Sequence, residues 1–316
     1  MQKIYKILFI IILSISSTLA KDIKPTFIIK SRGLVNDFVI DGFYLYVANG
    51  DGSVEIFDIR EQKKVSEIFI KPYKNVRGDI INPKVLSVDR MEGKTLIVTT
   101  SINGYRNIWI HNGNKLNLIN NSKTTAKEAR FVDRDKFILG TLGYDITLYS
   151  TNDGAYSTYS KQIEESSFSD MAISQDKKSM VSASESGEVT IIDIKSGNII
   201  NRLSSLNVDN IYKVAYKKGT IITGGQDRRV GVYPKVGKPY YIKSKFLIYC
   251  VGLSDDAKIG VYSSNEDNDL QLFDVSNGKK LDVLKGQDSV PSTIKFFNAR
   301  GIFSAGYGYN IYYWSL

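Results

Sequence analysis

The stretch SASESGEVTIIDIKSG, residues 182–197, contains the pattern that decides the fold of this chain. Two runs rich in β-branched and apolar residues, 178–185 and 188–194, are separated by the turn signal ESGE. A further strand-like segment lies on each side, at 170–174 and 198–203, beyond the turn signals QDKK and KSGN. The stretch therefore predicts a sheet of four short antiparallel strands, with 170–174 as the inner strand and 198–203 as the outer one.

The same pattern of a turn followed by alternating apolar residues recurs along the chain. The first apolar residue after each turn is Val54, Ile108, Ile146, Val189, Val230, Leu270 or Ile311. Successive members of this set are 54, 38, 43, 41, 40 and 41 residues apart. A period of roughly 40 to 45 residues with several short strands per unit is typical of β-propeller blades, whereas an open β-sandwich would not need such regular units. We therefore predict an all-β, seven-bladed propeller.

The two ends of the chain predict how the ring closes. The last unit ends at IYYWSL, residues 311–316, so it lacks its own outer strand. The strand-like segment PTFIIKS, residues 25–31, belongs to no unit. Pairing of the N-terminal segment with the last strand would remove open sheet edges, which otherwise invite aggregation. We therefore predict a propeller closed by pairing an N-terminal strand with the last blade.

The first twenty residues predict export. Two lysines precede an apolar run at 7–15, and small residues follow as far as Ala20. This order is that of a secretory signal peptide, with cleavage after Ala20. The alternative is an uncleaved N-terminal anchor, but Ser14 already interrupts the apolar run, which is short of the roughly 20 residues of a membrane span. We expect a signal peptide at 1–20, a single propeller domain at 21–316, a periplasmic location and no integral membrane anchor.

Composition restricts both the chemistry and the partners. The chain of 316 residues carries a formal net charge of +9, and loss of the two signal-peptide lysines leaves +7. A partner selected by charge should therefore be acidic, and export argues against nucleic acid. A single cysteine, Cys250, and a single histidine, His111, exclude an intramolecular disulfide, CxxC metal sites and sites built on two imidazoles. We expect a monomer that binds no metal and no cofactor.

Several units resemble WD40 repeats, among them ANGDGSVEIFDI, SASESGEVTIIDIKSG and GQDRRVGVY, and the resemblance extends over residues 25–316. It is degenerate, because the family's Gly-His dipeptide is absent. The Trp-Asp pair survives only as Phe57-Asp58, Ile192-Asp193 and Phe273-Asp274. The resemblance implies the propeller fold, but not the family's buried His-Ser-Asp-Trp network and not a specific partner. Turn residues such as Asp51 and Asp227 are therefore expected to cap their turns locally.

The organisation as a small, exported, cysteine-poor propeller is also similar to the NapL-type proteins that accompany periplasmic nitrate reductase. That similarity implies a non-catalytic interaction platform, accessory to a periplasmic redox enzyme such as nitrate reductase. The alternative is a lactonase-like hydrolase of small molecules, or a ligand-binding propeller, with its site at the mouth of the central channel. No catalytic residue is predicted from the sequence.

Four local patterns contain residue types that occur in functional sites, and each is interpreted as structural. Ser292 and Lys295 match Ser-x-x-Lys but lie in an expected inner strand. The Gly-rich segment 307–309 precedes no helix and so predicts no phosphate cradle. The acidic segment 265–269 lacks the spacing of a calcium loop and is interpreted as a solvated turn, and His111 as a turn residue.

A partner-binding face is the remaining functional prediction. In a propeller, the connections from second to third strands and those from one blade to the next emerge on one face. Tyr and Arg in these connections favour binding, because both residue types are enriched at interface hot spots. The candidate residues are Arg77, Tyr105, Arg106, Tyr144, Arg228, Arg229, Tyr307 and Tyr309.

Overall fold

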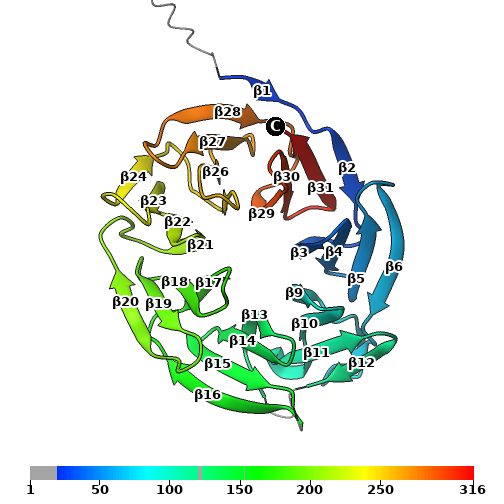
Figure 1. Cartoon of the computed structure of the whole chain (residues 1–316). Helices are drawn as coiled ribbons and strands as arrows, with labels where there is room; N and C mark the ends of the chain where they lie inside the picture. The colour runs from blue at the N-terminus through cyan, green and yellow to red at the C-terminus, as the bar shows by residue number, and fades with distance from the viewer. Residues whose placement is uncertain (1–19, 120–122, 153) are drawn as a thin grey trace, which may run out of the picture.

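The computed structural model describes residues 20–119, 123–152 and 154–316, so nearly all of the predicted signal peptide lies outside the described residues. The described chain forms a ring of seven β-sheets, the blades, each with one strand next to the central axis and one at the periphery (Figure 1). The prediction of an all-β, seven-bladed propeller is confirmed. No helix among these residues is long and apolar enough to cross a membrane.

The first four blades each contain four strands, ordered from the axis to the periphery. Blade 1 contains β3 (Val35–Asp41), β4 (Tyr44–Asn49), β5 (Ser53–Asp58) and β6 (Lys63–Phe69). Blade 2 contains β9 (Val85–Met91), β10 (Lys94–Thr100), β11 (Arg106–Asn112) and β12 (Lys115–Leu118). Blade 3 contains β13 (Ala126–Asp133), β14 (Lys136–Thr141), β15 (Asp145–Ser150) and β16 (Tyr156–Gln162). Blade 4 contains β17 (Phe168–Ile173), β18 (Ser179–Ser184), β19 (Val189–Asp193) and β20 (Ile199–Leu203).

The remaining blades follow the same order, except that the N-terminal strands join the last two. Blade 5 contains β21 (Ile211–Lys217), β22 (Thr220–Gly225), β23 (Arg229–Tyr233) and β24 (Tyr240–Lys243). Blade 6 contains β25 (Val251–Leu253), β26 (Ile259–Ser263), β27 (Leu270–Asp274), β28 (Lys280–Leu284) and β1 (Asp22–Ile23). Blade 7 contains β29 (Pro291–Phe297), β30 (Gly301–Gly306), β31 (Asn310–Ser315) and β2 (Phe27–Lys30). A hairpin of β7 (Tyr73–Lys74) and β8 (Ile80–Ile81) lies between blades 1 and 2, and a 3-10 turn spans Ile102–Gly104.

The ring closes as predicted, through an N-terminal strand. Strand β2 pairs antiparallel with β31, placing Ile29 opposite Ile311. The parallel pairing of β1 with β28 was not predicted, since a strand of two residues has no readable alternation. Both N-terminal strands run along the outer edge of the ring (Figure 1).

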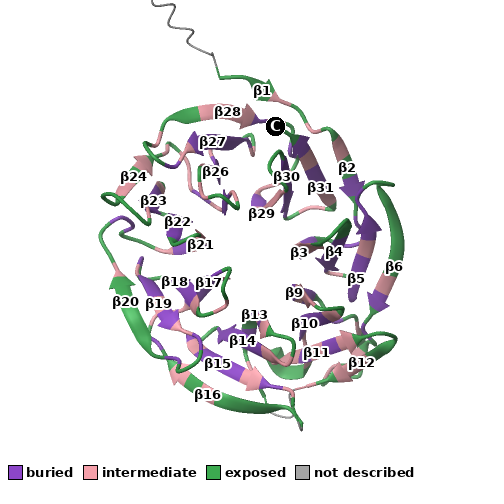
Figure 2. Cartoon of the chain, viewed as in Figure 1, coloured by how far each residue is buried: buried purple, intermediate pink, exposed green. Residues whose placement is uncertain are grey.

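The hydrophobic core lies between neighbouring blades. Phe38 and Leu45 of blade 1, for example, share one apolar cluster with Phe303 and Ile311 of blade 7. Both faces of the middle strands are therefore covered, and β22 is buried along its whole length. The outer strands β6, β16 and β20 are mostly exposed (Figure 2). This burial gradient explains why the middle strands read as near-continuous apolar runs.

The antiparallel blades sort their connections onto two opposite faces. One face, the turn face, is formed by the connections from first to second strands and from third to fourth strands. These are residues 42–43, 59–62, 92–93, 113–114, 134–135, 151–152, 154–155, 174–178, 194–198, 218–219, 234–239, 254–258, 275–279 and 298–300. The opposite face, the loop face, is formed by the connections from second to third strands and by those between blades. These are residues 31–34, 50–52, 70–84, 101–105, 123–125, 142–144, 163–167, 185–188, 204–210, 226–228, 244–250, 264–269, 285–290 and 307–309.

Of the two turn residues expected to act as caps, one does so. The Asp227 carboxylate accepts a hydrogen bond from the Arg229 backbone N–H at 3.1 Å. In blade 1 the expectation for Asp51 is wrong, because Asn49 fills that role. Its side-chain oxygen accepts from the backbone N–H groups of Asp51 at 3.0 Å and Ser53 at 3.3 Å. Asn49 is fully buried at the end of its strand, where its side chain closes the turn without a charge.

Candidate functional site

The structure brings most of the predicted partner-binding residues to the loop face or to its strand ends. Arg77 lies at the tip of the β7–β8 hairpin and is exposed. Arg228 is exposed in blade 5, and Tyr105 is half-buried in blade 2 beneath the Lys123 amine, 5.1 Å from its ring centroid. In blade 7, Tyr307 is 71% exposed and Tyr309 is 48% exposed.

Tyr144 was wrongly predicted to lie on the binding surface. Its side chain is fully buried between blades 3 and 4, and its hydroxyl lies 2.7 Å from the Ser182 hydroxyl. Its ring packs against Phe168 with the centroids 5.7 Å apart. The left-handed backbone of Tyr144, with φ of 62°, occupies the place in the turn that Gly187 takes in blade 4. Burial of a large aromatic ring offsets the strain of that conformation.

Two of the predicted arginines make contacts within the chain. The Arg229 guanidinium lies 4.6 Å from the ring centroid of Tyr241 and donates to the Leu206 carbonyl at 3.2 Å. Arg106 donates to the Tyr105 carbonyl at 3.0 Å and lines a cavity at the loop-face mouth of the channel. Their charges are therefore less available to a partner than that of Arg77.

Exposed apolar side chains distinguish the loop face from the turn face. Large exposed apolar residues of the turn-face connections, as far as these are described, are Phe43 and Val236. Those of the loop face are Leu34, Val76, Ile80, Ile102, Leu142, Val208, Tyr307 and Tyr309. Beside them, the rings of Tyr212 and Tyr249 stack with centroids 5.6 Å apart. The sequence analysis missed this ring pair, because its members come from different blades.

Charge is divided unevenly over the loop face. Basic residues gather in the 70–84 connection, which contains Lys71, Lys74, Arg77 and Lys84 but only one acidic residue. Acidic residues prevail in three other connections, 163–167, 185–188 and 264–269. The turn-face connections contain more Lys and Arg than Asp and Glu. The positive charge of the chain is thus not concentrated on the predicted face as a whole, but on its hairpin and on the opposite face.

The central channel contains a second group of charged residues, which the sequence analysis did not single out. In four consecutive blades, a carboxylate of the inner strand accepts a backbone N–H from the next inner strand. These pairs are Asp37 with Val88 at 3.1 Å, Asp89 with Phe131 at 2.7 Å, Glu128 with Met171 at 3.3 Å, and Asp170 with Val214 at 2.9 Å. The sequence signal was an acidic residue inside successive apolar inner strands, which costs stability unless it is hydrogen-bonded.

Two cations neutralise most of this group. Arg130 pairs with Asp37 at 3.1 Å and with Glu128 at 2.6 Å, and Lys213 pairs with Asp170 at 2.9 Å. Burial raises the pKa of the Glu128 carboxyl to about 7, against the lowering effect of Arg130 and with a further rise from Asp170. Burial also acts to raise the pKa of Asp37, but the charges of Arg130, Lys295 and Lys213 outweigh it and the pKa is lowered.

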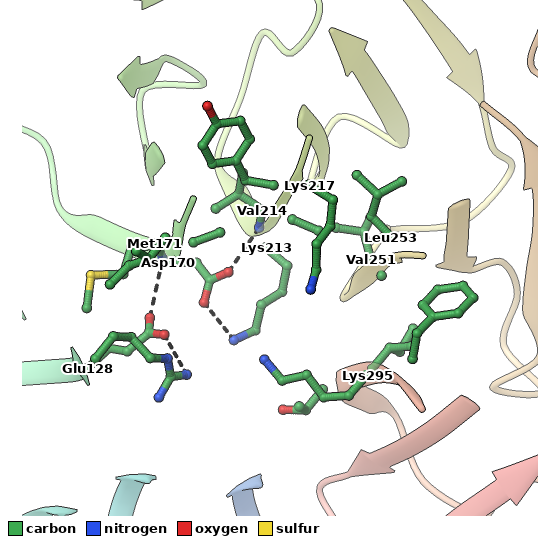
Figure 3. A pocket seen from close by; sticks show the side chains of 18 of the residues that line it. Glu128, Asp170, Met171, Lys213, Val214, Lys217, Val251, Leu253 and Lys295 are labelled. Atoms are coloured by element: carbon green, nitrogen blue, oxygen red, sulfur yellow. Dashed lines mark hydrogen bonds and ion pairs between the residues drawn. The ribbon is translucent and has the colours of Figure 1, made fainter. Parts of the chain in front are cut away.

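The charged layer separates two cavities of the channel. The cavity toward the loop face has a volume of about 300 Å³ and is lined by Asp37, Arg106 and Lys127, among others. The cavity toward the turn face has a volume of about 310 Å³ and contains Lys217 and Lys295. Figure 3 shows this second cavity, with the side chains of Lys213, Lys217 and Lys295 directed into it.

The residues that the sequence analysis interpreted as structural make contacts within the chain. Asn265 and Asp269 of the acidic segment bond to each other, the Asp269 backbone N–H donating to the Asn265 side chain at 3.0 Å. Ser292 donates to the Ala305 carbonyl at 3.4 Å within blade 7. The expectation that His111 is a turn residue is wrong, because it lies within strand β11 opposite Thr95 of β10, and burial lowers its pKa. The described residues contain no group of three or more His, Cys, Asp or Glu placed to hold a metal ion.

Comparison with known proteins supports the fold. No protein-family model matches the chain. Autophagy-related protein 16 of Arabidopsis thaliana is 26% identical over 144 residues, which is 43% of this chain and only 28% of the length of that relative. Among solved structures, the β-propeller domain of Cps50 (Swd1) from Myceliophteria thermophila superposes with a TM-score of 0.73 at 14% identity, covering 92% of this chain and 99% of that domain. The chain therefore has the β-propeller fold of that domain.

Proposed function

We propose that this protein is a non-catalytic platform that binds a protein partner through the loop face. The observation that carries the proposal is the set of exposed apolar and aromatic side chains on that face, supplied by connections of several blades. Such side chains are more numerous in the described connections of the loop face than in those of the turn face, and neighbouring ones, such as Val76 and Ile80 of the hairpin, favour a site of interaction. The propeller fold is consistent with a protein-interaction platform.

The charge pattern supports an acidic partner at one sector of the loop face. Lys74 and Arg77 extend on the exposed hairpin between blades 1 and 2, beside Val76 and Ile80, which are 76% and 73% exposed. The hairpin therefore combines an apolar contact with positive charge. Acidic connections over blades 4 and 6 would repel the same acidic segment, which would orient the partner on the face.

We further propose that the protein is exported to the periplasm and is accessory to a redox enzyme there, such as nitrate reductase. The order of charged, apolar and small residues at 1–20 supports export, and the small, cysteine-poor propeller supports the accessory role. A direct test is binding of the purified protein to purified periplasmic nitrate reductase from the same organism. If the protein does not bind the reductase but captures a different periplasmic protein, the reductase is excluded as the partner and the proposal of an interaction platform still holds.

The hairpin provides the sharper experiment. We expect the double variant Val76→Ser with Arg77→Ala to weaken capture of the partner about tenfold or more, and to reduce the salt dependence of binding. Both side chains are exposed, so the thermal midpoint should stay nearly unchanged. A matched control is Lys178→Ala on the turn face, which should bind like the wild type.

Two outcomes would contradict the proposed function. Equal capture and an equal salt profile for the hairpin variant would exclude the hairpin as the binding sector. Turnover of a lactone substrate by the wild type would favour the hydrolase alternative.

The double variant Arg228→Ala with Arg229→Ala should weaken capture of the partner less than the hairpin variant does, because Arg229 is held against Tyr241.

A further inference from the structure

One cation of the channel, Lys295, makes no direct hydrogen bond or ion pair among the described residues. Lys295 lies on β29 and directs its amine into the turn-face cavity (Figure 3). No hydrogen bond or ion pair joins that amine to another described residue, in contrast to Arg130 and Lys213. Burial lowers the pKa of the Lys295 amine and the charge of Arg130 lowers it further, against the raising effect of Asp37, Glu128 and Asp170. These carboxylates do not contact the amine, so an anion bound directly to it would stabilise the charge of this partly buried group.

The carboxylates of the channel already have hydrogen-bond partners, and Asp89, which lines the same cavity, accepts the Phe131 backbone N–H at 2.7 Å. Asp37, Glu128 and Asp170 each accept a backbone N–H of the next blade and a charged hydrogen bond from Arg130 or Lys213. The inner strands of blades 5 to 7 contribute no carboxylate, since they read IYKVAYK, VGL and PSTIKFF. On this side of the channel the charged residues of the inner strands are all lysines.

Lys213 and Lys217 face the same cavity as Lys295 (Figure 3). The Lys217 amine is 2.7 Å from Asp255, but this pair is near the mouth, where 62% of the Asp255 side chain is exposed. Three amines from two strands therefore surround one space of about 310 Å³. That volume is at the lower end of the range for small-molecule sites.

We propose that this cavity binds a small oxyanion, a phosphate or a carboxylate, between the amines of Lys213, Lys217 and Lys295. The anion would enter from the turn face, where basic residues outnumber acidic ones and raise the local concentration of anions. Lys295 supplies the principal contact, because among the described residues its amine, unlike those of Lys213 and Lys217, makes no direct ion pair. The site does not depend on the proposed partner, which binds at the opposite face.

The test is calorimetric titration of the purified protein with inorganic phosphate and, separately, with succinate, at constant ionic strength. We expect at least one of them to bind, and Lys295→Met to weaken that binding about tenfold or more, as expected for loss of a charged hydrogen bond. The matched control Lys258→Met removes a turn-face lysine whose side chain is 81% exposed, and should bind like the wild type. The anion that binds more tightly, inorganic phosphate or succinate, shows whether the site prefers a phosphate or a carboxylate.

The proposal is overturned if neither anion binds below about 10 mM, a free energy of binding too weak to be specific. It is also overturned if both lysine variants bind alike. If the Lys295→Met variant does not fold, acetylation of the wild-type protein provides the test instead. Saturating anion should slow acetylation of Lys295, read by mass spectrometry, relative to that of Lys258. Equal acetylation of Lys295 with and without the anion would contradict the site.

Discussion

Blades 1 to 5 and the closing blades 6 and 7 are held to their neighbours by different contacts. On each inner strand from β3 to β17, a carboxylate accepts a backbone N–H of the next inner strand, and the last of these contacts reaches β21. Strands β25 and β29 offer no carboxylate, and blades 6 and 7 are bound instead along their outer edges by β1 and β2. One part of the ring is joined at the axis and the other at the periphery.

The difference follows from the position of the chain ends. Blades 1 to 5 follow one another without a break in the chain, so contacts at their inner strands need only fix the angle between blades. Blade 7 must join blade 1 across the chain termini, and there an added strand replaces the missing covalent link. Because β25 and β29 contain no carboxylate, Lys295 finds no ion-pair partner on these two inner strands.

Removal of the N-terminal strands should have the largest effect. Deletion of residues 22–30 removes the pairing of β2 with β31 and the burial of Ile29 and Phe27, whose ring stacks on Tyr313 at 4.7 Å. Burial of two such side chains contributes about 3 to 6 kcal/mol. We expect urea denaturation to show a loss of roughly 5 kcal/mol, and light scattering to show association through the exposed edge.

A matched pair of point variants separates burial from sequence position. Ile29→Ala should destabilise by about 2 to 5 kcal/mol, because Ile29 is 2% exposed. Ile28→Ala, at a residue that is 51% exposed on the same strand, should change little. An unchanged midpoint for the deletion or for Ile29→Ala would mean that β2 does not close the ring.

Replacement of Arg130 tests the contacts near the central axis that join blades 1 to 5. Arg130→Met leaves Asp37 and Glu128 buried without their counter-charge, and removal of one partner from such a cluster typically costs about 3 to 5 kcal/mol. The control Lys136→Met breaks an exposed pair with Asp133 and should cost about 1 kcal/mol or less. Similar unfolding midpoints for the two variants would show that the charged layer adds no stability.

The third prediction concerns pH. The pKa of Glu128 is raised from 4.5 to about 7 in the folded protein, mainly by burial. Between these values the folded state binds more protons at Glu128 than the unfolded state does, so this group's contribution to stability decreases as pH rises from about 4.5 to about 7.

The variant Glu128→Gln isolates that contribution from those of other titrating groups. On going from pH 4.5 to pH 8, the stability of the wild type relative to Glu128→Gln should fall by about 1 to 3 kcal/mol. Thermal melts of both proteins at the two pH values provide the measurement. Parallel pH profiles would mean that Glu128 titrates alike in the folded and unfolded states.

The ring and its closure could be predicted from sequence, because both depend on patterns that repeat. Seven units anchored from Val54 to Ile311 and the orphan segment 25–31 made the arrangement readable. The inaccurate details depend on contacts between units. Tyr144 reads as a turn residue until the neighbouring blade is in place to bury it, and Asn49 takes the role expected of Asp51 because its strand end is buried.

The channel could not be found from sequence for a related reason. Asp37, Glu128 and Asp170 are separate acidic residues until the ring brings each within reach of the next blade. Composition likewise predicts a basic protein but does not say on which face the charge lies. That division depends on the alternation of turn-face and loop-face connections, which only the fold defines.

The smallest effect is expected at the first residue of the proposed mature chain. The backbone nitrogen of Lys21 donates to Asp282 at 2.8 Å, and the Lys21 carbonyl accepts from the Val283 N–H at 3.0 Å. Cleavage after Ala20 would turn that amide nitrogen into a charged α-ammonium group beside a carboxylate. Asp282→Asn should then destabilise the processed protein by about 0.2 to 1 kcal/mol, as for other exposed pairs, and a chain that retains Ala20 by less.

Mass spectrometry of the exported protein comes first and should find Lys21 at its N-terminus, whereas retention of residues 1–20 would contradict export with cleavage. Urea denaturation of the processed and the extended chain, each with and without Asp282→Asn, then measures the coupling. A coupling that 1 M salt reduces would identify an ion pair, because salt screens exposed charges. Equal effects of the substitution in both chains would mean that the α-amine adds nothing to the neutral hydrogen bond. In that case the outer-edge contacts of β1 are those of strand pairing alone, and cleavage leaves the closure of blade 6 unchanged.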